Sequence, residues 1–220
     1  MPNDSVIVAG SVPALDGDIP ELHSLAIDDS ITLVPGLTVN YQSIPRPAAA
    51  SGPDPHDLPL SFSIHRSDKI IFRDTTDGYN HDPTLVDSAI RKVYPLWVPT
   101  GKDAGELLVL FNNRPSKDLA RRFFIRGRRI TKIDTLLTFD GPARDVDGGG
   151  KREFSGYLDY GEVWDDEQGR HRCTYNPTLY YEVRPTDLAL DSALTMRKAR
   201  AQYGKFYGFN YSAKPVILVK

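Results

Sequence analysis

The sequence predicts a mostly β protein, either an antiparallel β-barrel with calycin-like closure or a β-sandwich, with two short helices. Seventeen glycines and seventeen prolines are scattered along the chain and indicate many turns. Eleven tyrosines and nine phenylalanines suit pleated surfaces better than helices. Short strand patterns follow one another without the βαβ alternation of a parallel sheet. Together these observations favour antiparallel sheets, with the helices as lids or plugs.

Length and charge limit the organisation and the classes of partner. The 220 residues predict a single β-rich domain over residues 1–220. A formal net charge of −2 gives no overall field that attracts nucleic acid or an anionic membrane. The one cysteine excludes an intramolecular disulfide. Because no leader-like segment or apolar run of about 20 residues is present, we expect no membrane span and a cytoplasmic location.

The first half of the chain predicts two hairpins. Apolar residues alternate over 31–42 around a Pro35-Gly36 turn. The proline-rich stretch 44–59 predicts an exposed loop or arm. Residues 60–64 and 69–73 then alternate on either side of a tight turn.

Two segments carry helix signals, and strands lie between them. Asp82 is a good N-cap for a short helix over 82–93. Strand patterns follow at 96–98, 107–111 and 123–139. A second helix is predicted from Thr186 or Asp187 to about Tyr203, with Gly204 as its stop.

The segment 153–183 predicts a hairpin with one aromatic, apolar face. A tip at residues 166–169 places Trp164 opposite His171 and Glu162 opposite Cys173. Because side chains alternate between the faces, one face collects the apolar residues and is expected to point inward. Its predicted substrate-binding residues are Trp164, Phe154, Leu158, Tyr181 and Cys173.

Polar groups on this aromatic face suggest acid–base chemistry. Glu162 is the unusual residue, because a carboxylate on an apolar wall must be paired, hydrogen-bonded or protonated. His171 would lie diagonal to it, about 7–8 Å away between α-carbons. Tyr160 and Tyr175 add two phenols, so these four residues are the predicted catalytic set. Two alternatives stay open: a rim ion pair, and a one-residue register shift near Gly161 that would turn Glu162 outward.

A basic turn is the other candidate site. Arg126, Arg128 and Arg129 could hold an anion, because guanidinium groups bind phosphate or carboxylate in a bidentate fork. The alternative is a solvated hairpin edge whose charges prevent pairing with another sheet. No zinc, P-loop, Rossmann or HExxH spacing occurs, so we expect no metal and no cofactor.

Three functions are compatible with the sequence. The first is a β-barrel enzyme that performs cofactor-independent cyclisation, isomerisation or hydration of a hydrophobic small molecule. The second is a barrel that binds an apolar ligand without chemistry. The third is a structural subunit of a viral or phage-like assembly, in which the arm at 44–59 makes contacts between chains. We favour the first because of Glu162, expect nucleic acid to be an unlikely partner, and keep a homo-oligomer as an option.

Overall fold

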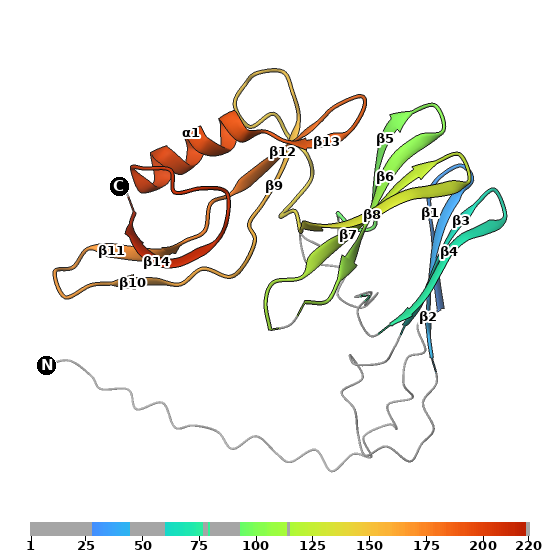
Figure 1. Ribbon diagram of the computed structural model, residues 1–220, viewed down its shortest axis with the longest axis horizontal. Helices are drawn as coiled ribbons and strands as arrows, with labels where there is room; N and C mark the ends of the chain where they lie inside the picture. The colour runs from blue at the N-terminus through green and yellow to red at the C-terminus, as the bar shows by residue number, and fades with distance from the viewer. Residues whose placement is uncertain (1–27, 45–59, 77–78, 80–92, 114, 219–220) are drawn as a thin grey trace, which may run out of the picture.

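The computed structural model describes residues 28–44, 60–76, 79, 93–113 and 115–218. Within these residues the chain forms four antiparallel sheets and one helix (Figure 1). In chain order the elements are β1 (Asp28–Val34), β2 (Leu37–Ser43), β3 (Leu60–Arg66), β4 (Lys69–Thr76), β5 (Leu96–Gly101), β6 (Ala104–Phe111), β7 (Leu119–Arg126), β8 (Arg129–Leu137), β9 (Glu153–Gly156), β10 (Val163–Asp165), β11 (His171–Tyr175), β12 (Leu179–Val183), β13 (Leu188–Leu190), α1 (Ser192–Tyr203) and β14 (Ser212–Ile217). The predicted helix over 82–93 and the predicted arm at 44–59 lie almost wholly outside the described residues.

Two four-stranded meanders make up the N-terminal part. One sheet has the order β1-β2-β3-β4 and the other β5-β6-β7-β8, so every strand pairs with its neighbour in sequence. The predicted hairpins at 31–42 and 60–73 are confirmed, with Gly36 in the left-handed conformation that its turn requires. The sheets remain separate in the described residues, and no closed barrel forms.

The meander β5–β8 is the middle layer of the molecule. Along β6 every residue from Gly105 to Leu110 is buried, as expected for a strand that is covered on both faces. Leu107 and Val109 join the core shared with β1–β4, whereas Leu108 joins a second core on the opposite face. The C-terminal strands contribute Phe154, Leu179 and Leu188 to that second core, so residues beyond 150 cover the second face of β6.

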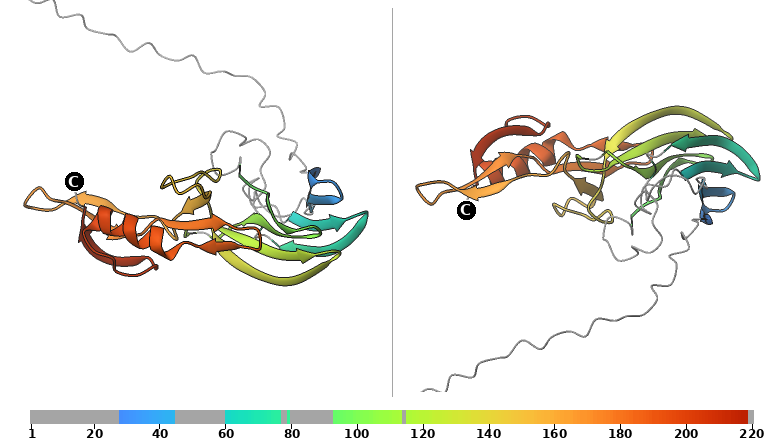
Figure 2. Two further views of the ribbon diagram at one scale, coloured as in Figure 1. Left: turned by 90° about the horizontal axis from the view of Figure 1, so that it is seen from above. Right: turned by 90° about the horizontal axis from the view of Figure 1, so that it is seen from below.

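The C-terminal part contains two small sheets and the helix. Strands β13, β12 and β9 form one sheet, and β10, β11 and β14 form the other. Helix α1 packs Ala199 and Tyr203 against Cys173, Tyr175 and Val216 in a third core. Figure 2 shows these C-terminal elements at the opposite end of an elongated molecule from the strands β1–β4.

The helix begins later than the sequence predicted. Residues 188–190 form strand β13, and Asp191 is the N-cap, accepting a hydrogen bond from the Leu194 N–H at 2.8 Å. Thr186 and Asp187 lie in the turn before β13, so neither caps the helix. The predicted stop is confirmed, because Gly204 is the C-cap at φ 71°.

Candidate functional site

The predicted hairpin over 153–183 is divided between two sheets. Strand β9 pairs with β12, whereas β10 pairs with β11. In the β10–β11 ladder Val163 faces Cys173 and Trp164 faces Arg172, so the predicted register is wrong by one residue. A shift of one residue moves every side chain of one strand to the other face relative to its partner. The single aromatic wall therefore does not form.

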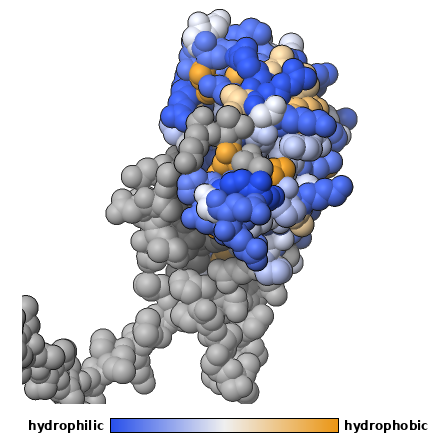
Figure 3. All heavy atoms as spheres, turned by 90° about the vertical axis from the view of Figure 1, so that its left-hand side faces the viewer, coloured by the Kyte–Doolittle hydropathy of each residue, from blue (hydrophilic) through white to orange (hydrophobic). Residues whose placement is uncertain are grey.

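Glu162 and His171 do not share an enclosed face. Glu162 is exposed and lies just before β10; its backbone N–H donates to the Thr174 Oγ1 at 3.0 Å. His171 is half exposed and pairs with Asp165 rather than with Glu162. Figure 3, which views this end of the molecule, shows a mostly hydrophilic surface with scattered apolar residues. The prediction that both groups face a hydrophobic interior is wrong.

The two predicted phenols occupy different environments. Tyr160 is 62% exposed, whereas Tyr175 is 1% exposed. The Tyr175 hydroxyl donates to the Gly208 carbonyl at 2.7 Å and accepts from the Tyr207 N–H at 3.2 Å. Burial raises the pKa of Tyr175. The Tyr175 hydroxyl thus bonds to backbone groups inside a core while Tyr160 is exposed, so the two phenols do not share one face as predicted.

The predicted substrate-binding residues are divided between two cores. Phe154, Leu158 and Tyr181 lie in the core between the middle sheet and β9–β12–β13. Cys173 lies in the core beneath α1, where burial raises the pKa of its thiol. Trp164 is partly exposed on β10. No common cavity contains these five residues.

An apolar pocket lies elsewhere, at the edge strand β5. Its volume is about 280 Å³, close to the lower limit of small-molecule sites. The lining comes from four separate segments of the chain and is Val93, Leu96, Trp97, Val98, Pro99, Pro142, Ala143, Arg152, Phe154 and Val183. Phe154 is the one predicted substrate-binding residue in this lining. Sequence periodicity could not find the pocket, because the segments meet only in the folded chain.

Arg152 is the one charged residue among the described residues that line the pocket. Its Nε and Nη2 atoms donate to the Ala143 carbonyl at 3.2 and 2.7 Å. Among the described residues no carboxylate forms an ion pair with this exposed guanidinium. The pocket thus combines an apolar wall with one cation that has no anionic partner in the described chain.

The Trp97 indole packs against the core shared with β1–β4 and is held there by a glycine on the neighbouring strand. A β-carbon at Gly105 would overlap the six-membered ring of Trp97 and come within 2.7 Å of the Val98 carbonyl oxygen. The indole therefore lies directly over the β6 backbone, which only glycine allows. Trp97 also lies 6.0 Å beneath the Arg66 guanidinium.

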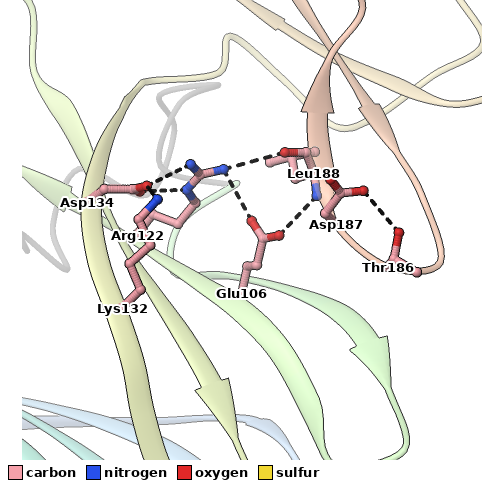
Figure 4. A network of polar contacts seen from close by, with 7 residues as sticks. All are labelled: Glu106, Arg122, Lys132, Asp134, Thr186, Asp187 and Leu188. Carbon is pink, nitrogen blue, oxygen red and sulfur yellow. Dashed lines mark hydrogen bonds and ion pairs between the residues drawn. The ribbon is translucent and has the colours of Figure 1, made fainter.

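A buried polar network joins the middle sheet to β13 (Figure 4). Glu106 is 1% exposed and accepts the Leu188 N–H at 3.0 Å. Arg122 donates to Glu106 and to the Leu188 carbonyl, each at 3.4 Å, and pairs with Asp134 at 2.7 Å. Burial raises the pKa of Glu106, and the Arg122 and Lys132 cations lower the pKa of Asp134. Side chains of the middle sheet thus satisfy both backbone groups of Leu188.

Sequence reasoning missed Glu106, although a signal was present. The stretch 105–111 reads GELLVLF, in which one carboxylate interrupts an apolar run. A carboxylate among apolar residues must be paired, hydrogen-bonded or protonated, as expected for Glu162, and the requirement is stronger at Glu106 because β6 is covered on both faces. Glu106 contacts the Leu188 N–H of β13 and Arg122 of β7, and Arg122 also donates to the Leu188 carbonyl, so these contacts join β13 to the middle sheet.

Lys117 is a second buried charge in a region without regular structure. It is 3% exposed, and its Nζ lies 3.1 Å from Asp140 and 3.5 Å from the centre of the Tyr157 ring. The Nζ also donates to the Thr138 and Tyr157 carbonyls, at 3.4 and 3.3 Å. Burial lowers the pKa of Lys117. These contacts join the segment after β8 to the segment after β9.

The three arginines predicted to bind anions lie together at the β7–β8 turn. Arg126, Arg128 and Arg129 are all exposed. In the described chain none of them forms an ion pair or a side-chain hydrogen bond. Their placement agrees with a solvated hairpin end and also leaves them accessible to an anion.

Within the described residues, no group of three His, Cys, Asp or Glu side chains could hold a metal ion, and no helix is long and apolar enough to cross a membrane. The comparisons with known proteins give no match: no family model, no curated protein and no solved structure matches this chain.

Proposed function

We propose that the protein binds a small apolar molecule carrying an acidic group, in the pocket beside β5. The observation that carries the proposal is the lining: nine apolar residues and the single cation Arg152. Binding sites for small molecules are mostly apolar, with a few placed polar groups that fix the orientation. Apolar burial would supply the affinity, and the Arg152 guanidinium would pair with the acid.

This proposal replaces catalysis with binding. The enzyme predicted from the sequence requires Glu162 and His171 to act together beside an enclosed substrate, whereas both are exposed and His171 pairs with Asp165. Among the described residues, the pocket lining has no carboxylate, imidazole or phenol. The catalytic function therefore stays a prediction from sequence alone, and the pocket favours binding without chemistry.

Tryptophan fluorescence tests the proposal directly. The chain has two tryptophans, so Trp164→Phe leaves Trp97, a lining residue whose indole packs against the core shared with β1–β4, as the only tryptophan reporter. Octanoate is the probe, and octanol is its neutral counterpart with the same chain. We expect both to change the Trp97 emission, with octanoate binding about tenfold more tightly because a charge-assisted hydrogen bond contributes about 1.5 kcal/mol.

Two substitutions separate the roles of shape and charge. Arg152→Gln should weaken octanoate about tenfold and leave octanol unchanged. Ala143→Phe should fill the pocket and abolish both responses, whereas Ala213→Phe, at an exposed position of β14, should abolish neither. If the Trp97 emission is insensitive to both probes, or if Ala143→Phe binds them as well as Ala213→Phe does, the pocket is not a binding site.

A further inference from the structure

Four tight turns meet at one end of the two meanders. They lie at 35–36, 67–68, 102–103 and 127–128, between the paired strands of each hairpin. The Ser67 N–H donates to the Gly36 carbonyl at 2.9 Å, and the Gly127 N–H donates to the Asp103 carbonyl at 2.6 Å. Figure 1 shows all four turns on the same side of the molecule, away from α1. We call this surface, residues 35–36, 66–70, 101–104 and 126–129, the turn end.

The turn end is strongly basic. It carries two acidic residues, Asp68 and Asp103, and six basic residues, which are Arg66, Lys69, Lys102, Arg126, Arg128 and Arg129. Six positive charges less two negative charges give a net charge of +4, whereas the formal net charge of the whole chain is −2. The rest of the chain therefore carries −6, and the positive charge is concentrated at one end.

These charges are not neutralised within the described chain. Five of the six basic residues are exposed and form no ion pair with a described carboxylate. The sixth, Arg66, lies over the Trp97 ring, and its buried Nη1 atom has no hydrogen-bond partner. Uncompensated charges of one sign repel one another, so an anionic partner would stabilise this arrangement.

We propose that the turn end binds the surface of an anionic phospholipid bilayer. The five exposed cations lie at or beside three separate turns, which face the same side of the molecule (Figure 1), so one extended anionic surface can contact them together. Each Lys or Arg near such a surface contributes about a fivefold gain in binding. Ile70, which is 47% exposed beside Lys69, offers an apolar side chain that can insert among the headgroups.

Single-stranded nucleic acid is the competing partner, and the side chains favour it less. Binding of single strands combines a basic groove with aromatic rings on which the bases stack. The exposed large apolar residues of the described chain are Ile70, Ile133, Tyr160, Val163 and Tyr207, and only Ile70 belongs to the turn end. No exposed aromatic ring is therefore available there as a stacking platform.

Vesicle co-sedimentation of the full chain tests the proposal. The probes are vesicles of phosphatidylcholine containing about one third phosphatidylserine and vesicles of phosphatidylcholine alone. We expect binding to the first and not to the second, and loss of that binding when the ionic strength rises to about 1 M and the Debye length falls to about 3 Å. Arg126, Arg128 and Arg129 all changed to Gln should weaken the binding on the order of 100-fold.

A matched variant separates position from net charge. Arg144, Arg200 and Lys214, all changed to Gln, remove the same charge from exposed sites away from the turn end, and this variant should bind vesicles as the unmodified chain does. Ile70→Ser should weaken vesicle binding several-fold and leave binding of a labelled single-stranded oligonucleotide unchanged. The proposal is overturned if the two triple variants bind vesicles equally, or if the oligonucleotide binds and the phosphatidylserine vesicles do not.

Discussion

Replacing Glu106 should separate its role as a hydrogen-bond acceptor from its role as a buried charge. Glu106→Ala leaves the Leu188 N–H without its acceptor in a buried site, a loss of about 1–3 kcal/mol. Removing the buried γ-methylene adds about 1 kcal/mol. Arg122 keeps Asp134 at 2.7 and 2.9 Å, so no cation is left alone. We therefore expect a decrease of about 3 kcal/mol in the free energy of unfolding.

Glu106→Gln should behave differently, because its side-chain carbonyl can still accept the Leu188 N–H. It loses only the long contact to Arg122, at 3.4 Å, and it no longer buries a carboxylate. We expect its free energy of unfolding to lie within about 1 kcal/mol of that of the unmodified chain at neutral pH. Urea unfolding measures both variants; in thermal melts the Ala variant should lose about 6–12 °C, from about 2–4 °C per kcal/mol at this chain length.

The pH dependence provides an internal check on the Glu106 argument. Burial raises the pKa of Glu106 in the folded chain above its ordinary value of 4.5. The folded state thus binds this proton more tightly than the unfolded state, and the resulting stability is lost as the pH rises through the folded pKa. Relative to Glu106→Gln, the unmodified chain should lose stability as the pH rises above about 4.5. Equal stability of the Ala and Gln variants would show that Glu106 is not a needed acceptor for the Leu188 N–H. A pH-independent difference between the unmodified chain and Glu106→Gln would show that burial does not raise the pKa of Glu106.

Three further substitutions test other contacts by urea or thermal unfolding. Asp191→Ala removes the N-cap of α1 and should lower the free energy of unfolding by about 1 kcal/mol, and Asp191→Ser should restore most of it; no difference between the two would contradict the capping role. Gly105→Ala forces Trp97 off the β6 backbone, so it should lower the free energy of unfolding by about 1–3 kcal/mol and shift the Trp97 emission. Gly141→Ala is the control and should change neither, because a β-carbon added there meets nothing within 4 Å. Burial lowers the pKa of Lys117 in the folded chain, so the unmodified chain gains stability from this group as the pH rises towards 10.5. Lys117→Met should therefore make the free energy of unfolding less dependent on pH in the alkaline range. An unchanged alkaline profile would contradict the lowered pKa of Lys117.

Sequence patterns predicted correctly those elements that depend on neighbouring residues alone. The hairpins at 31–42 and 60–73 follow from alternation on either side of a turn, and Gly204 ends α1 because glycine adopts the left-handed conformation easily. The start of α1 was misplaced because both Asp187 and Asp191 resemble caps in sequence. Pairing with β12 commits residues 188–190 to a strand and leaves Asp191 at the cap position.

The candidate site depended on one register, and local sequence does not determine that register. Strand β10 pairs with β11 over only three residues, from Val163 to Asp165, so a register shift of one residue would lose few backbone hydrogen bonds. The segments on either side of β10 and β11 leave the ladder, and β9 and β12 pair with each other in a different sheet. The pocket beside β5 could not be predicted for a different reason. Its lining comes from residues 93–99, 142–143, 152–154 and 183, which are far apart in the sequence and share no periodic pattern.

The order of strands within the sheets has a consequence for the folding pathway. In both meanders each ladder joins strands that are adjacent in sequence, and the longest segment that any of them closes is 44–59. Two of the C-terminal ladders, β9–β12 and β11–β14, join distant segments, with Glu153 opposite Glu182 and Arg172 opposite Ile217. Since long loops close more slowly, we expect the meanders to form first and to provide the surface on which β9, β12 and β13 assemble. Residues of β6 would then have high φ-values, whereas the contacts of β13 would form after the rate-limiting step and act mainly on the unfolding rate.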